Sequence, residues 1–284
     1  MKDLIITLED LKKGVDPVGK IVNADCLEAM KYLPGESIDL VITSPPYENL
    51  RTYKGYVFNF EGIAKELFRV MKEGGVVVWI VADQTVNGSE SGTSFKQALY
   101  FKEQCGFNLH DTMIYMKDVR YFYPCRYGHS FEYMFVFSKG KPKTFNPIKR
   151  KNLNPPVTKI VTERKKDGNL KISKYISTEE SPLYNVWYYS SGYMKTTKDK
   201  IAYQHPAIFP DQLAYDHIVS WSNKEGIILD PMCGSGTVGK MAEKAGRKWI
   251  MIDIALEYCQ IAAKRIREEK RQKKLPLIPK GDKQ

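Results

Sequence analysis

A short polar segment, Thr43-Ser44-Pro45-Pro46-Tyr47, follows the apolar run of residues 38–42. The two prolines lack backbone N–H donors, so the carbonyl groups around them are free to face outward as acceptors. One small hydroxyl and one aromatic ring stand beside these acceptors, and the segment contains no side chain that is a base at neutral pH. Such a site suits an amino group carried on a flat ring.

A second polar segment follows the apolar run of residues 227–229 and begins with a carboxylate, Asp230. It continues as Pro231-Met232-Cys233-Gly234-Ser235-Gly236-Thr237 and leads into a helical pattern. Glycine lets the backbone turn tightly and lets a ligand come close to it, and Asp230 can accept hydrogen bonds from that ligand. The pattern indicates a buried strand, a ligand-binding loop and a helix.

The spacing of the glycines alone leaves several ligands open. Gly234-x-Gly236-x-x-Gly239 matches the dinucleotide fingerprint, but a pyrophosphate has no need of a carboxylate such as Asp230. With Lys240 the loop nearly matches a phosphate-binding loop, but Met241 stands where Ser or Thr would hold magnesium. An acid here suits a cationic, donor-rich ligand such as the amino-acid end of S-adenosylmethionine. A nicotinamide-dependent oxidoreductase and a purely structural turn are the alternatives.

A third acid, Asp253, ends the apolar run of residues 249–252, about one helix after the glycine loop. At the end of the second strand of a strand–helix–strand unit, an acid binds ribose hydroxyls. An aspartate at this place can also cap the following helix, and both roles can coexist. The three segments together predict an α/β fold whose parallel strands bring these residues to one edge of a sheet.

The motifs and their order resemble the beta class of amino-methylating DNA methyltransferases, a circularly permuted class in which the catalytic motif precedes the cofactor motif. The resemblance covers most of the chain. It extends to four other segments, residues 20–34, 67–76, 131–139 and 205–210. It implies a Rossmann-like, S-adenosylmethionine-dependent methyltransferase fold with a mostly parallel sheet and an inserted target-recognition region.

The resemblance also implies roles for individual residues. The catalytic motif corresponds to Ser44, Pro45, Pro46 and Tyr47. The cofactor site corresponds to Asp25, Thr43, Asp230, Met232, Gly234, Ser235, Gly236, Thr237 and Asp253, with Asp25 on the adenine ring. The family commonly has Phe at position 232, and Met is apolar and polarizable enough to take its place. No metal is implied.

The target base follows from one residue of the catalytic motif. In the resembled class, Asp at position 44 accompanies adenine and Ser accompanies cytosine, so Ser44 favours the N4 amine of cytosine. The segment His205-Pro206-Ala207-Ile208-Phe209-Pro210 is also similar to the cytosine-modifying form. Adenine N6 is the alternative. In either case the base must leave the duplex to reach a buried cofactor.

Positive charge is concentrated in two parts of the chain, residues 139–200 and the C-terminal residues 264–284. Residues 139–200 hold 15 Lys and Arg against 5 Asp and Glu, within a chain of net charge +11. A basic patch attracts polyanions through release of counterions. We therefore expect residues 1–139 to form the catalytic half, 140–200 a target-recognition insert, and 201–284 the cofactor half with a basic tail. A hairpin is predicted around Asp167-Gly168. The candidate DNA contacts are Arg126, Arg150, Arg164 and Trp187.

The remaining composition excludes several classes of protein. The 284 residues include no uninterrupted apolar stretch of about 18, which argues against a membrane span. The N-terminus lacks the features of a secretion signal. Five scattered cysteines show no spacing typical of disulfide or zinc sites. We expect a cytoplasmic enzyme, monomeric or homodimeric, that acts on double-stranded DNA and has a cognate restriction endonuclease as a possible partner.

Overall fold

The computed structural model describes residues 4–46, 58–118, 124–154 and 156–274. The chain divides into two compact units. The main unit combines Met1–Asn146 with Asn185–Gln284, and the insert unit is Pro147–Tyr184. The insert unit is shorter than the expected insert of residues 140–200, because both flanks of that segment belong to the main unit.

The main unit is built on a nine-stranded sheet of order β1-β2-β15-β14-β3-β4-β8-β7-β13. Among the strands of the described chain that form it, β8 runs antiparallel to both its neighbours and the others run parallel. The prediction of a mostly parallel α/β sheet is therefore confirmed. In sheet order the strands are β1 Ile5–Thr7, β2 Lys20–Asn23, β15 Lys248–Asp253, β14 Ile227–Asp230, β3 Ile38–Thr43, β4 Met71–Val81, β8 Phe131–Ser138, β7 Asn108–Met116 and β13 Val186–Tyr188.

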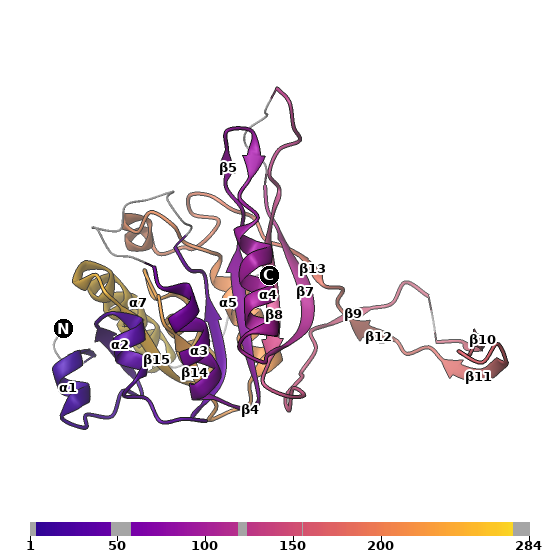
Figure 1. Ribbon diagram of the computed structural model, residues 1–284, viewed down its shortest axis with the longest axis horizontal. Coiled ribbons are helices and arrows are strands. Elements are labelled where there is room, and N and C mark those ends of the chain that lie inside the picture. The colour runs from indigo at the N-terminus through magenta and orange to yellow at the C-terminus, as the bar shows by residue number, and fades with distance from the viewer. Residues whose placement is uncertain (1–3, 47–57, 119–123, 155, 275–284) are drawn as a thin grey trace, which may run out of the picture. The chain divides into compact units, whose positions relative to one another are not determined.

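Helices cover both faces of this sheet (Figure 1). Strand β3 shows why: Val41 packs into one apolar cluster while Leu40 and Ile42 pack into the other, since successive side chains of a strand point to opposite faces. The first cluster is covered by α1 Leu8–Lys12, α2 Cys26–Met30, α3 Phe60–Val70 and α4 Thr93–Glu103. The second is covered by α5 Asp211–Trp221, α6 Thr237–Ala245 and α7 Leu256–Lys274, and the short 3-10 helix η1 spans Lys200–Gln204.

The strand order reverses between β3 and β14. From β3 the chain continues to β4 on one side, and from β14 it continues through α6 to β15 on the other. The register pairs Ile228 with Leu40 and Leu229 with Val41, so the two strands end side by side. In open parallel sheets, ligands bind beyond the carboxyl ends of the strands at such a reversal. The fold thereby places residues 44–46 next to the loop that follows Asp230.

The insert unit consists of two antiparallel strand pairs. Strand β9 Lys149–Lys151 pairs with β12 Glu180–Pro182, and β10 Thr158–Arg164 pairs with β11 Leu170–Ile176. The hairpin predicted around Asp167-Gly168 is confirmed: Gly168 has a φ of +84°, and the Asp167 carboxylate accepts a hydrogen bond from the Asn169 N–H at 3.0 Å. A smaller hairpin of the main unit joins β5 Thr85–Val86 to β6 Ser89–Glu90. None of the helices in the described ranges is long and apolar enough to cross a membrane.

Candidate functional site

The two polar segments identified in the sequence meet through one buried hydrogen bond. Thr43 is the last residue of β3 and Asp230 the last of β14, and both are almost completely buried. The Thr43 hydroxyl donates to Asp230 Oδ1 at 2.8 Å, and the Met232 N–H donates to the same oxygen at 3.1 Å. The structure thus joins the start of the predicted catalytic motif to the start of the predicted cofactor loop.

The environment of Asp230 suits a cationic ligand. Burial raises the pKa of this carboxyl group to about 7, although the hydrogen bonds from Thr43 and Met232 act to lower it. A carboxylate in a poorly solvated place is stabilised by a positive charge or by further donors. A positively charged ligand would therefore bind the ionised form of Asp230.

Two further carboxylates stand at the ends of neighbouring strands. Asp253, at the end of β15, accepts hydrogen bonds from the N–H groups of Gly234 at 2.8 Å and Ala255 at 2.9 Å. It therefore holds the glycine loop as well as the turn before α7. Asp25 follows β2, is exposed, and caps α2 by accepting from the Glu28 N–H at 3.1 Å. Each carboxylate can accept further hydrogen bonds, because an ionised carboxyl group has about four lone-pair sites.

The glycines of the loop stand where a side chain would meet neighbouring parts of the protein. A Cβ added at Gly234 would lie 2.8 Å from the His205 ring, and one at Gly236 would lie 2.5 Å from Ala262 Cβ. At Gly239 it would lie 2.9 Å from both Ile266 and Met251. The space in the Cβ direction of these glycines is filled by the protein itself, so their lack of a side chain permits close packing of the loop and α6. Gly234 and Gly236 also have positive φ angles, of 49° and 76°.

The other predicted site residues lie around this centre. Directly after β3, Pro45 is buried and Ser44 and Pro46 are half-buried. Tyr47 lies outside the described residues. In the glycine loop, Met232 is half-buried and packs against the first apolar cluster, and Ser235 and Thr237 are buried.

A buried arginine that the sequence reasoning missed contacts this loop. Arg265 in α7 has no exposed surface, and its Nη1 lies 2.9 Å from the Ser235 carbonyl oxygen and 3.0 Å from the hydroxyls of Ser235 and Thr237. Its guanidinium also pairs with Asp199 at 2.8 Å and Asp211 at 2.7 Å. The signal was present in the sequence, because Arg265 falls on the buried stripe of α7 between Ala262 and Ile266, where helical periodicity calls for an apolar residue.

Of the four candidate DNA contacts, Arg126 and Trp187 lie in the main unit, and Arg150 and Arg164 lie in the insert unit. Arg126 donates to Thr85 Oγ1 and the Gly88 carbonyl oxygen, both at 2.8 Å, which ties it to the β5–β6 hairpin. Trp187 lies in β13, with its ring 4.8 Å from that of His217, and packs against the second apolar cluster. These contacts give Trp187 a place in the packing of the main unit. In the insert unit, the Arg150 guanidinium stacks on the Tyr184 ring at 4.2 Å, whereas Arg164 is exposed on β10.

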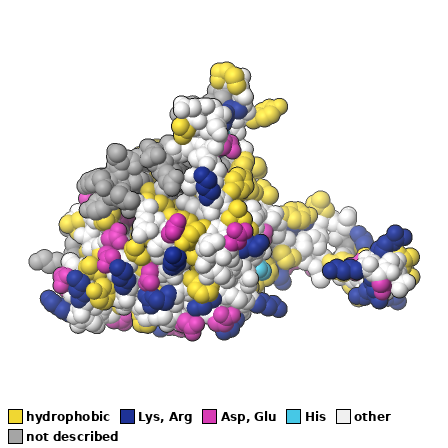
Figure 2. All heavy atoms as spheres, viewed as in Figure 1, with side chains coloured by type: hydrophobic (Ala, Val, Ile, Leu, Met, Phe, Trp, Pro, Cys, Tyr) yellow, Lys and Arg dark blue, Asp and Glu magenta, His cyan; other side chains and the backbone are white. Residues whose placement is uncertain are grey.

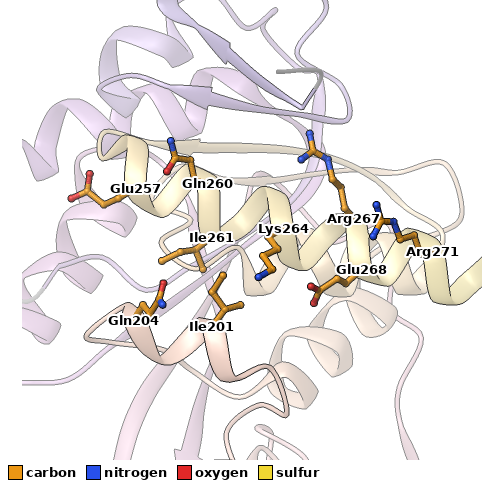
Figure 3. A pocket seen from close by; sticks show the side chains of 9 residues that line it. All are labelled: Ile201, Gln204, Glu257, Gln260, Ile261, Lys264, Arg267, Glu268 and Arg271. Atoms are coloured by element: carbon orange, nitrogen blue, oxygen red, sulfur yellow. The ribbon is translucent and has the colours of Figure 1, made fainter. Parts of the chain in front are cut away.

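A surface hollow of about 440 Å³ lies between η1 and α7 (Figure 3). Lys264, Arg267 and Glu268 of α7 line it, together with Ile201 and Gln204 of η1. Its lining mixes positive, negative and apolar side chains and includes neither catalytic-motif residues nor Asp230. We therefore treat it as separate from the site at the ends of β3 and β14.

Comparison with known proteins identifies the family. A family profile described as DNA methylase matches residues 38–264, which is most of the chain and contains both polar segments, residues 43–47 and 230–237. The chain belongs to this DNA methylase family. Family membership overturns the alternative of a nicotinamide-dependent oxidoreductase, and it agrees with the carboxylate of Asp230 at the start of the glycine loop.

Individual DNA methylases resemble the chain over most of its length. The orphan methyltransferase M.BamHII of Bacillus amyloliquefaciens is 54% identical over 238 residues, which are 81% of this chain and 89% of the relative. DNA adenine methyltransferase YhdJ of Escherichia coli (strain K12) is 26% identical over 263 residues, covering 87% of this chain and 82% of the relative. The fold matches that of PvuII DNA methyltransferase (cytosine-N4-specific) with a TM-score of 0.66 at 22% identity, covering 87% and 85% of the two chains. Other structures with this fold were solved with S-adenosylmethionine bound.

Proposed function

We propose that this DNA methylase transfers a methyl group from S-adenosylmethionine to the N4 amine of a cytosine that is flipped out of double-stranded DNA. The observation that carries the proposal is the buried hydrogen bond between Thr43 and Asp230. It joins the strand end that precedes Ser44-Pro45-Pro46 to the start of the carboxylate loop, and this supports a target amine and a cofactor methyl group that bind side by side.

The residues at the ends of β2, β14 and β15 fit this cofactor. S-adenosylmethionine supplies an electrophilic methyl group bound to a sulfonium centre. Asp230 has the buried, ionisable carboxyl group that an ammonium or sulfonium ligand would hold in its charged form. We assign the ribose hydroxyls to Asp253, because an acid at the end of the second strand accepts from them in related α/β folds. The exposed carboxylate of Asp25 is an acceptor for the exocyclic amine of the adenine.

The catalytic motif supplies position and electrostatics rather than a base. The exocyclic amine of cytosine is a weak nucleophile because its lone pair is delocalised into the ring. The Ser44 hydroxyl and the Pro45 carbonyl oxygen accept its two hydrogens and favour a pyramidal nitrogen whose lone pair can attack. Tyr47 stacks on the flipped ring. Holding both reactants in line removes much of the entropic barrier, and the proton released afterwards passes to Ser44 or to water.

Cytosine is favoured over adenine by the catalytic motif itself. Position 44 is Ser, and the segment His205–Pro210 has Phe209 before its final proline; both features accompany cytosine in the resembled class. The likeness to DNA adenine methyltransferase YhdJ supports adenine N6 as the second candidate. Methylation of cytosine N4 and of adenine N6 would follow the same steps. The two reactions differ in the shape and the hydrogen-bond pattern that the base pocket must have.

The insert unit is our candidate for target recognition. Residues 147–184 contain nine Lys and Arg against four Asp and Glu. Figure 2 shows Lys and Arg side chains gathered over the β10–β11 hairpin. The major groove of DNA is wide enough for a two-stranded β-ribbon. Basic side chains of such a ribbon bind the DNA phosphates and so position it in the groove. Exposed Arg164, on the ribbon, has the side chain most suited to reading a guanine. A cognate restriction endonuclease is a further possible partner.

The proposal is tested by identifying the methylated nucleoside. The enzyme is incubated with unmethylated plasmid DNA and S-adenosylmethionine carrying a trideuterated methyl group, and the digested DNA is analysed by mass spectrometry. Deuterated N4-methylcytosine is expected, and the matched Ser44→Ala enzyme should yield far less of it. Deuterated N6-methyladenine in its place would establish the second candidate, and absence of label from both nucleosides would refute the function.

A further inference from the structure

We propose that Arg265 is the positioning residue of the cofactor loop: its guanidinium group holds the Ser235–Thr237 backbone in the conformation that binds S-adenosylmethionine. The inference rests on the proposed assignment of residues 230–237 to the cofactor. It goes beyond that assignment because Arg265 lies on α7, 30 residues from Ser235, and acts through the loop.

Arg265 contacts two carboxylates, the Thr197 hydroxyl at 3.3 Å, and the loop. Through Nε and Nη2 it pairs with the carboxylates of Asp199 and Asp211, at 2.8 Å and 2.7 Å. Through Nη1 it approaches three oxygens of the loop, the Ser235 carbonyl and the hydroxyls of Ser235 and Thr237, within 3.0 Å. The planar guanidinium presents its donors in a fixed fork, so the two carboxylates orient the nitrogen that faces the loop.

Neutralising the charges of Asp199 and Asp211 does not by itself explain why a buried arginine is needed at position 265. The Lys240 ammonium group already pairs with both, at 2.8 Å from Asp199 and 2.9 Å from Asp211. Hydrogen bonds from Lys240 and Arg265 outweigh burial and lower the pKa of Asp199, which keeps this carboxylate charged. In addition to these ion pairs, Arg265 donates hydrogen bonds to the loop.

Asp253 holds the loop at Gly234, and Arg265 holds it at Ser235 and Thr237; both anchors matter because the glycine-rich sequence constrains the backbone weakly. Gly234 and Gly236 both have positive φ angles, and glycine samples that region as readily as others. In the described chain, the N-terminus of α6 at Gly236 receives no side-chain cap. A loop of this kind must be held from outside to be pre-organised, and a pre-organised loop loses less entropy when its ligand binds.

Arg265→Lys tests the proposal, because lysine keeps the charge but cannot reach both carboxylates and the loop together. The matched control is Arg267→Lys, the same change two residues along α7 on the wall of the surface hollow (Figure 3). A second control, Lys240→Met, removes the other cation from Asp199 and Asp211. S-adenosylmethionine affinity is measured by calorimetry, folding by thermal unfolding, and loop order by hydrogen exchange of the amides of residues 234–237.

We expect Arg265→Lys to weaken S-adenosylmethionine binding about tenfold or more, as loss of hydrogen bonds from a charged group does. Exchange of the loop amides should be faster in the ligand-free variant, and KM for the cofactor should rise while kcat at saturating cofactor stays within about threefold of wild type. Both control variants should bind the cofactor with an affinity within about threefold of wild type. This should hold for Lys240→Met even if that substitution lowers the melting temperature.

Unchanged affinity in Arg265→Lys, or an equal loss in Lys240→Met, would overturn the positioning role. If Arg265→Lys does not fold, Asp199→Ala replaces it under the same criteria, because alanine removes the acceptor that orients Nε and leaves Asp211 in place. A wild-type enzyme that does not bind S-adenosylmethionine would instead refute the proposed cofactor site.

Discussion

The hydroxyl of Thr43 donates a hydrogen bond of 2.8 Å to the carboxylate of Asp230, across two neighbouring strands and 187 residues of sequence. Both side chains are almost completely buried. Because one belongs to the segment of the catalytic motif and the other to the cofactor loop, this contact fixes the distance between the two halves of the proposed site. Substitution of either residue should therefore affect cofactor binding.

Replacing Thr43 with the isosteric valine removes the donor without leaving a cavity. The Asp230 carboxylate then loses a hydrogen bond to its charged form, which is worth about 1.5–3 kcal/mol. Its pKa should rise further, and S-adenosylmethionine affinity at pH 7 should fall at least about tenfold. Calorimetry at pH 7 and pH 8.5 checks this, because the deficit should shrink at the higher pH, where the carboxyl group ionises despite the substitution.

Cofactor binding should depend on the ionisation of Asp230. Burial raises the pKa of this group to about 7, so the ionised form that binds a cation is depleted as the pH falls below that value. Wild-type affinity should drop by up to about tenfold per pH unit below 7, relative to Asp230→Asn, which binds weakly at every pH. Parallel pH profiles of the two enzymes would show that another group governs the dependence.

Asp230 should also make the stability of the ligand-free protein depend on pH. Stability should decrease as the pH rises, whereas cofactor affinity should increase. The folded-state pKa of Asp230 lies above the unfolded value of 3.8, so folding favours the protonated form. This contribution to stability is complete below about pH 4 and is lost as the pH rises through 7. Across that window, the free energy of unfolding of the wild type should fall relative to that of Asp230→Asn, as measured by urea titration at each pH.

The catalytic motif should be separable from cofactor binding. Ser44→Ala removes one acceptor for the target amine, and Tyr47→Ala removes base stacking worth about 1–3 kcal/mol. Both variants should bind S-adenosylmethionine with wild-type affinity and lose turnover, which is measured by methyl incorporation into DNA under saturating cofactor. Wild-type turnover by Ser44→Ala would show that its hydroxyl is not the acceptor.

Two cations of β10 should affect DNA recognition differently. Successive side chains of a strand point to opposite faces, so Arg164 and Lys159 project from opposite faces of the β10–β11 ribbon. If Arg164 reads a base, Arg164→Ala should relax the methylated sequence, found by sequencing of modified plasmid DNA, at a cost of about 1–3 kcal/mol. Lys159→Ala should weaken binding to all duplexes alike and lower the salt dependence of binding by about one unit of slope. Unaltered specificity and salt dependence in both variants would place recognition elsewhere, with the 118–127 segment as the next candidate.

Gly236 should be intolerant of any side chain. A Cβ there would meet Ala262 Cβ at 2.5 Å and would also be strained by the φ of +76°. Gly14 is the matched control, because its φ is +84° and nothing lies within 4 Å of its Cβ position. Gly14→Ala should cost only the backbone strain, about 1–2 kcal/mol. Gly236→Ala should lower the free energy of unfolding by about 1–3 kcal/mol more, through forced separation of α6 from α7. If Gly14→Ala and Gly236→Ala lower the free energy of unfolding equally, α6 and α7 can move apart without an energetic cost.

The sequence by itself determined which segments form strands and hairpins, and which polar side chains stand at the ends of the strands. Apolar runs that end in Thr43, Asp230 and Asp253 predict buried parallel strands, because strands covered on both faces are apolar throughout. Such strands carry their ligand-binding residues at their carboxyl ends. The Asp167-Gly168 turn likewise specifies its hairpin locally, since the glycine tolerates the positive φ that the turn requires. In each case the deciding interactions are between residues close together in the chain.

Tertiary structure decided what depends on residues far apart in the chain. Only the packing of α7 and β15 shows that Gly236 and Gly239 are glycines because Ala262, Ile266 and Met251 fill the adjoining space. Only the fold shows that β13 draws Trp187 into the main sheet, and that Arg265 reaches Ser235. Composition and periodicity report the burial of a segment but not its partner, because a partner distant in sequence is chosen by the global packing of the sheet and its helices.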